Sequence, residues 1–216
     1  MEPDAIEIRV AACLVEKQRT TPGAYPLSLN ALRLACNQAT NRDPVVAYDE
    51  ATVSDALRRL ALRGWTRLAS GPSSRARKYR HLLPEALAVS EEELALLTVL
   101  MLRGAQTPGE LKQRSERLHA FPDLGAVQEA LERLLERELV IRHPRGPGQK
   151  EERYEQVLGG APEADSGQPP APEEATSEER PGAAPGEERL DRIERELGEL
   201  RAEMTRLREA LGEDPS

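Results

Sequence analysis

The sequence predicts a mainly α-helical protein with small β-hairpins, an α+β fold built from two tandem winged-helix domains. A pattern of three helices followed by two short strands occurs twice, in residues 6–83 (the first repeat) and in residues 90–158 (the second repeat). Both repeats carry the phrase Thr-Pro-Gly ahead of their second helix, at residues 21–23 and 107–109. Beyond the second repeat the chain becomes acidic and then heptad-patterned, which predicts a different kind of structure there.

The first repeat is expected to begin with two helices. Apolar spacing predicts a helix over residues 4–19, with one face formed by Ile6, Val10, Cys13, Leu14 and Lys17. Ser28 is a suitable N-cap for the second helix, and Leu27 before it can pack on Leu32 as a hydrophobic staple. The residues of this second helix that we expect to point inward are Leu29, Leu32 and Cys36.

A third helix and a hairpin complete the first repeat. Asp49 is the expected N-cap of this helix and Gly64 its end. Its inner residues are Val53, Leu57 and Leu60. Strands are expected over residues 65–69 and 78–82, because a turn-rich stretch separates them.

The second repeat is predicted to open with an unusually apolar helix. Ser90 and Glu93 form a capping box, and apolar residues then cover nearly the whole circumference of a helix over residues 91–103. Such a helix is buried on more than one side, so we expect it to pack against the other repeat or against a second copy of the chain. Thr107 and Glu110 form the capping box of the next helix.

The last helix of the second repeat is expected to start after Asp123 as its cap. Its buried residues are Val127, Leu131, Leu134 and Leu135. Two strands follow, over residues 139–143 and 153–158. The winged-helix domains are therefore expected to span residues 1–84 and 85–158.

The remaining chain is predicted to contain a linker and a coil. Residues 159–186 are rich in Pro, Ala, Gly, Glu and Ser, which predicts a disordered acidic linker because such a segment buries too little surface to offset its chain entropy. Residues 187–212 carry a heptad seam, which predicts a coiled-coil helix. Its expected oligomerisation residues are Leu190, Ile193, Leu197, Leu200, Met204, Leu207 and Leu211. The flanking charges favour a parallel homo-oligomer; a lone amphipathic helix is the alternative, and dimer versus higher oligomer stays open.

Charge is distributed unevenly along the chain. The net charge is −8, yet residues 1–83 carry 13 Lys and Arg against 8 Asp and Glu, so the first repeat alone has the positive excess that phosphate contact requires. No run of about 18 apolar residues and no signal-peptide pattern occur, so we expect a cytoplasmic protein that does not enter a membrane. Cys13 and Cys36 lie in apolar helical patterns and are expected to be small buried residues, not metal ligands.

Several motifs resemble those of the YceH family of bacterial proteins, and they fall in both repeats. The matching stretches are Glu16-Lys17, Tyr25-Pro26-Leu27-Ser28-Leu29-Asn30-Ala31-Leu32, Ala35-Cys36-Asn37-Gln38 followed by Thr40, Arg42 and Pro44-Val45, and Leu102-Arg103-Gly104-Ala105-Gln106-Thr107-Pro108-Gly109-Glu110-Leu111. The resemblance implies a tandem winged-helix body over residues 6–158, in agreement with the pattern of elements. It implies no activity, because the family is known as uncharacterised.

The first functional hypothesis is a transcriptional regulator that binds duplex DNA through the first repeat. Its turn and third helix would enter the major groove, while the wing would contact phosphate. The candidate nucleic-acid-binding residues are Asn37, Gln38, Thr40, Asn41 and Arg42 on the turn, Arg58, Arg59 and Arg63 on the helix, and Arg75, Arg77, Lys78 and Arg80 on the wing. The alternative for any one of them is a helix cap or a solvated surface charge.

The second hypothesis is a protein-docking scaffold, similar in role to the tandem winged-helix ScpB subunit of bacterial condensin. Acidic side chains on the third helices favour it, since phosphates would repel Asp55 and the group Glu129, Glu132 and Glu136. Besides DNA, the expected partner is the chain itself, through the coil or the apolar helix over residues 91–103. We expect no enzyme, cofactor, metal or catalytic residue, because His81, His119 and His143 are far apart and lack a nucleophile pattern.

Overall fold

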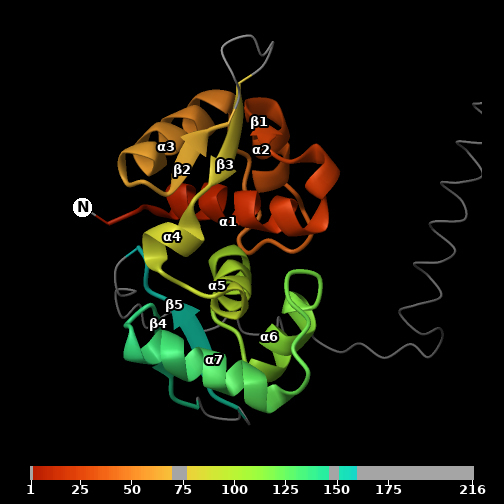
Figure 1. Ribbon diagram of the computed structural model, residues 1–216, viewed down its shortest axis with the longest axis vertical. Helices are drawn as coiled ribbons and strands as arrows, with labels where there is room; N and C mark the ends of the chain where they lie inside the picture. The colour runs from red at the N-terminus through yellow and green to blue at the C-terminus, as the bar shows by residue number, and fades with distance from the viewer. Residues whose placement is uncertain (1, 70–76, 146–150, 160–216) are drawn as a thin grey trace, which may run out of the picture. The chain divides into compact units, whose positions relative to one another are not determined.

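The computed structural model describes residues 2–69, 77–145 and 151–159, and these lie in one compact unit, Met1–Asp165. This unit is mainly helical with two small antiparallel sheets, as the sequence predicted at the level of fold class (Figure 1). The expected coil and all but the first residue of the expected linker lie outside the described residues. No helix among the described residues is long and apolar enough to cross a membrane.

The first repeat contains three helices and a three-stranded sheet. Its elements are α1 (Ala5–Thr20), the 3-10 turn Pro22–Ala24, β1 (Leu27–Ser28), α2 (Leu29–Cys36), α3 (Glu50–Leu62), β2 (Thr66–Leu68) and β3 (Lys78–His81). The strand order is β1-β3-β2, and both neighbouring pairs are antiparallel. The strand β1 was not predicted, because two residues are too few to show an alternating pattern.

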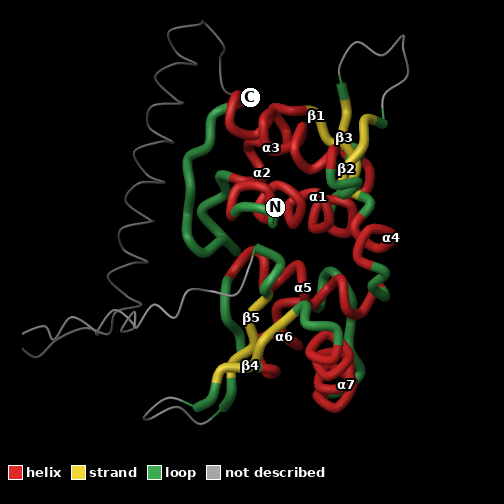
Figure 2. The backbone as a smooth tube through the Cα atoms, turned by 90° about the vertical axis from the view of Figure 1, so that its left-hand side faces the viewer, coloured by secondary structure: helices red, strands yellow, loops and turns green. Residues whose placement is uncertain are grey.

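The second repeat follows a short helix, α4 (Leu83–Leu87), which was also not predicted. Its elements are α5 (Glu91–Arg103), α6 (Pro108–Ser115), α7 (Leu124–Glu136), β4 (Val140–His143) and β5 (Arg153–Gln156). The strands β4 and β5 pair in an antiparallel hairpin, and an isolated bridge from Gln106 to Tyr154 extends it on the side of β5. The hairpins of the two repeats lie at opposite ends of the unit (Figures 1 and 2).

Side-chain caps start the helices where the sequence predicted them. The Ser28 hydroxyl accepts a hydrogen bond from the backbone N–H of Ala31, and the Asp49 carboxylate accepts one from Thr52. Complete capping boxes join Ser90 to Glu93 and Thr107 to Glu110. Each of these caps supplies an acceptor to a backbone N–H that has no partner within the helix, so a short sequence signal fixes the start of the helix.

The two repeats share one hydrophobic core, whose centre is the contact between α1 and α5 (Figure 2). Residues 7–15 of α1 and 93–102 of α5 are all buried. The apolar circumference of α5 is thus explained by contact with the other repeat, one of the two alternatives that the sequence left open. Within α5 the Thr98 hydroxyl is fully buried and donates to the carbonyl oxygen of Leu94, so no polar atom of that side chain lacks a partner.

Candidate nucleic-acid interface

The hairpin of β2 and β3 gathers cationic side chains on one face. Arg67 lies directly opposite Arg80 in the strand register, and Lys78 lies two residues from Arg80 on the same face. Like charges directly opposite each other destabilise an antiparallel pair. Neither the Arg67 side chain nor the Arg80 side chain has an ion-pair or hydrogen-bond partner among the described residues. This face of the hairpin is therefore a positively charged surface that a bound anion would stabilise.

A groove of about 620 Å³ runs between α3 and this hairpin. Its floor contains Leu57 and Tyr79, and its rim carries three guanidinium groups, those of Arg58, Arg67 and Arg77. Arg77 is exposed and also has no partner among the described residues. Sequence reasoning overlooked Arg67, although its place in a strand opposite Arg80 follows from the expected hairpin if the register is known.

The arginines of α3 are largely neutralised by carboxylates. Arg58 pairs with Asp55 at 2.5 Å between Nη2 and Oδ1. Arg59 pairs with Asp4 at 2.8 Å and also contacts Asp55 at 3.0 Å, while the Nε of Arg63 donates to Glu7 at 2.9 Å. The last two arginines therefore tie α3 to the start of α1. We expect these three arginines to contribute less to a nucleic-acid interface than the sequence predicted.

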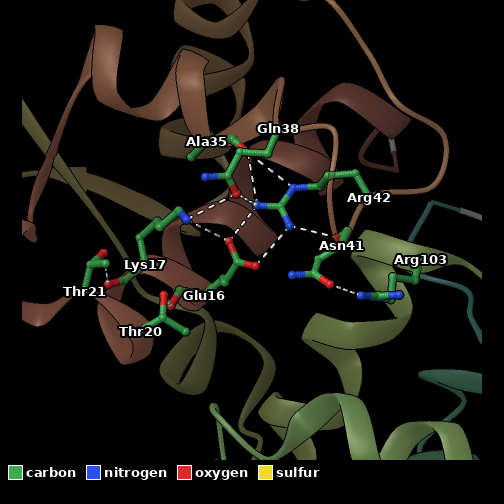
Figure 3. Close-up of polar contacts among 9 residues, drawn as sticks. All are labelled: Glu16, Lys17, Thr20, Thr21, Ala35, Gln38, Asn41, Arg42 and Arg103. Atoms are coloured by element: carbon green, nitrogen blue, oxygen red, sulfur yellow. Dashed lines mark hydrogen bonds and ion pairs between the residues drawn. The ribbon is translucent and has the colours of Figure 1, made fainter. Parts of the chain in front are cut away.

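The turn after α2 places Arg42 in the interior, which corrects the prediction that this side chain contacts nucleic acid. The Arg42 side chain is 0% exposed and forms an ion pair of 2.6 Å with Glu16 of α1 (Figure 3). It also donates to the Ala35 carbonyl oxygen at 3.0 Å and to the Gln38 side chain at 3.1 Å. Its role is to hold the turn against α1 and α2, so it is unavailable to a ligand.

Two amides of the turn are likewise used internally. The Asn37 side chain donates to the backbone oxygen of Tyr48 and accepts from its N–H, both at 2.8 Å, and so closes the loop before α3. The Gln38 oxygen accepts from Lys17 at 3.2 Å as well as from Arg42 (Figure 3). Contact of these two amides with base edges therefore stays a prediction, and it would compete with the internal hydrogen bonds.

The rest of the predicted site divides into exposed and undescribed residues. Thr40 and Asn41 are exposed, and the Asn41 side chain accepts a hydrogen bond from Arg103 of α5. Arg75 lies outside the described residues, as do all seven predicted oligomerisation residues of the coil. The site that the structure brings together is therefore the hairpin with the rim of the groove, not the turn.

The hairpin of the second repeat differs because acidic partners accompany its cationic groups. Arg142 lies 3.6 Å from Glu152, His143 lies 2.7 Å from Glu155, and Arg153 lies 3.1 Å from Glu110. Both hairpins are antiparallel, but among the described residues the cationic side chains of the second one are accompanied by carboxylates, unlike Arg67 and Arg80 of the first.

His81 is a structural residue at the base of the first hairpin. Its Nδ1 accepts from the N–H of Leu83 at 3.4 Å, so Nε2 carries the proton and donates to the Gln18 side-chain oxygen at 2.5 Å. Burial lowers the pKa of His81 to about 4, which keeps the ring neutral at pH 7. The described residues include no group of three or more His, Cys, Asp or Glu side chains that could hold a metal ion.

Comparison with known proteins gives consistent matches over most of the chain. The family model described as "Protein of unknown function, DUF480" matches residues 4–149. A UPF0502 protein of Geobacter metallireducens is 48% identical over 90% of this chain and 88% of the relative. A UPF0502 protein of Citrifermentans bemidjiense is 42% identical over 99% and 96%, and one of Azotobacter vinelandii is 51% identical over 73% and 70%.

Proposed function

The chain belongs to the DUF480 family, and from its fold and charge distribution we propose that it binds duplex DNA without catalysing a reaction. The resemblance to YceH proteins is in this way confirmed as a family relationship. Neither the family description nor the relatives' names specify an activity. The proposal therefore rests on the molecule itself.

The order of elements supports a pair of winged-helix domains. In each repeat three helices precede an antiparallel hairpin. A short extended segment just before the second of these helices pairs with the hairpin, β1 with β3 in the first repeat and Gln106 with Tyr154 in the second. In a winged helix the third helix and the hairpin, or wing, form the surface that approaches nucleic acid. In the first repeat these elements are α3 and the hairpin of β2 and β3.

The observation that carries the proposal is the opposed pair Arg67 and Arg80, together with Arg77, which lines the groove with Arg67. Three guanidinium groups whose side chains have no partner among the described residues are suited to ionic contact with phosphate oxygens. Phosphate contacts position a protein on DNA but carry no sequence information directly. Because α3 presents ion-paired arginines and acidic residues, we propose that backbone contact dominates and that base reading is weak.

Fluorescence anisotropy of a labelled random duplex tests this proposal. We expect measurable binding at low salt, with an affinity that falls steeply as salt rises because each neutralised phosphate releases a counterion. Replacing Arg67, Arg77 and Arg80 together with alanine is expected to weaken binding by about 10- to 100-fold and to reduce the log–log salt slope by about 2–3.

The matched control is Arg142→Ala, which removes an exposed cation from the hairpin of the second repeat. It is expected to bind duplex DNA nearly as the unaltered protein does. No binding at low salt, or equal binding by the triple variant and the control, would refute the DNA proposal.

One observation favours a protein partner as the second candidate function. Leu62 at the end of α3 is 82% exposed, Leu68 beside the groove is 51% exposed, and the outer face of α7 carries Glu129, Glu132 and Glu136. A scaffold function predicts binding that survives high salt, because apolar burial is not screened by ions. The same anisotropy series, repeated with candidate proteins in place of DNA, distinguishes the two functions.

Self-association through residues 187–212 remains a proposal based on their heptad pattern. We expect the mass in solution to be a multiple of the chain mass, and truncation of residues 187–216 to reduce it to that of a monomer. Light scattering coupled to size-exclusion chromatography measures both. If the truncated and full-length proteins have the same oligomeric state, this segment does not drive assembly.

A further inference from the structure

A cavity of about 440 Å³ lies where the two repeats meet, apart from the proposed DNA surface. Its lining comes from α1, from the turn after α2, from α5 and from α6 with the residues that follow it. The polar groups of the lining include Thr20, Asn41, Arg103, Gln113, Arg114 and Arg117. The volume is within the range of about 300–1,000 Å³ that is typical of small-molecule sites.

The charge of the lining is strongly unbalanced. Three arginines face one carboxylate, that of Glu16, and Glu16 is already paired with Arg42 at 2.6 Å. Burial alone would raise the pKa of Glu16, but the guanidinium of Arg42 lowers it below its usual value, so this carboxylate is ionised and engaged. It therefore does not neutralise the cavity.

The carboxylate that pairs with Arg114 is shared as well. Glu110 lies 3.4 Å from Arg114 and 3.1 Å from Arg153, so one negative charge serves two guanidinium groups. Arg117 is exposed at the mouth of the cavity and has no partner among the described residues. The cavity thus retains an excess of positive charge.

The pKa of Arg103 reflects this excess of positive charge. Burial lowers the pKa of Arg103, and the neighbouring charges of Arg114 and Arg42 lower it further, against the opposing effect of Glu16 and Glu110. Its guanidinium nevertheless stays protonated near neutral pH. It donates a hydrogen bond to the Asn41 side chain, which connects α5 to the turn of the first repeat (Figure 3). The Asn41 backbone is left-handed, with φ 60°, and asparagine is one of the few residues that adopt this conformation readily.

We propose that this cavity binds a small organic dianion, held by Arg114 and Arg117 with Arg103 at its inner wall. Guanidinium groups bind carboxylate and phosphate oxygens through paired hydrogen bonds, and two or more of them suit a charge of −2. Val99, Leu102 and Leu118 supply an apolar wall for the carbon body of the ligand. The common chemistry is a dianionic oxyacid, either a dicarboxylate or a phosphomonoester.

A ligand in this cavity would contact both repeats and so stabilise their association. The test is the melting temperature of the full chain in millimolar succinate, glycerol 3-phosphate or inorganic phosphate, with sodium chloride at equal ionic strength as reference and glycerol as the neutral arm. At a ligand concentration about 100-fold above Kd, we expect a rise of about 5–10 °C. The stronger of the succinate and glycerol 3-phosphate responses identifies the oxyacid.

Two variants and a control locate the site. Arg114→Gln and Arg117→Ala are each expected to weaken binding of the effective anion about tenfold or more, as measured by calorimetry. Arg142→Ala, which removes a cation from the distant hairpin, is expected to leave the affinity unchanged. The proposal is overturned if no dianion raises the melting temperature above the chloride reference, or if all three variants respond alike. Because it concerns a different surface, it does not depend on DNA binding.

Discussion

Replacing Glu16 with alanine is expected to lower the free energy of unfolding by about 3–5 kcal/mol, because the Arg42 charge would stay buried without its partner. The Arg42 side chain is 0% exposed, and its ion pair with Glu16 is 2.6 Å long (Figure 3). The remaining acceptors of this guanidinium are neutral oxygens, among them that of Ala35. Urea denaturation measures the loss directly.

The matched control for this experiment is Glu91→Ala. Glu91 also forms an ion pair, with Arg19 at 2.9 Å, but its side chain is 73% exposed. Solvent screens such a pair, so its removal is expected to cost less than about 1 kcal/mol. Equal costs for the two variants would show that the buried pair does not stabilise the turn. Removing both partners, with Glu16→Leu and Arg42→Met, is expected to recover part of the loss because no unpaired charge remains.

Lowering the pH from 6.5 to 4 is expected to remove about 3 kcal/mol of stability through His81 alone. Burial lowers the pKa of this ring from 6.5 to about 4 in the folded protein. Between these values the unfolded chain binds a proton that the folded protein does not. The stabilisation is therefore complete above pH 6.5 and is lost as the pH falls through this window.

The contribution of His81 is measured by urea denaturation at several pH values in the unaltered protein and in His81→Gln. Carboxylates contribute to the pH dependence of both proteins, so the difference between the two curves isolates the histidine. We expect the variant to be less stable at pH 7 and to lose less stability on acidification. If the two proteins lose the same stability between pH 6.5 and 4, the ring does not resist protonation.

The helices were predictable because their signals are local. A cap such as Ser90 and its partner Glu93 are three residues apart, and the spacing of apolar residues in α7 marks its buried face without reference to the rest of the chain. The brief elements β1 and α4 were missed, since they have too few residues for a period and depend on what they pack against.

The candidate site was only partly predictable, because the availability of a charge depends on distant residues. Arg42 belongs to a polar turn that looks like a surface loop in the sequence, yet its partner Glu16 is 26 residues away. Likewise, Arg63 donates a hydrogen bond to Glu7, which is 56 residues away in the sequence. No local pattern indicates that these two side chains are engaged while Arg67 and Arg80 are not.

The sequence by itself determined two repeats of three helices and a hairpin, where the helices other than α4 begin, which faces they bury, and the positive charge of the first repeat. These features arise from interactions within a turn or two of helix or from composition, so the order of residues suffices. Only the tertiary structure decided that α5 packs on α1, that Arg42 is enclosed, and that Arg103, Arg114 and Arg117 line one cavity. The physical reason is that Coulomb and packing energies depend on distance in space, and residues far apart in the chain become neighbours only when the core closes.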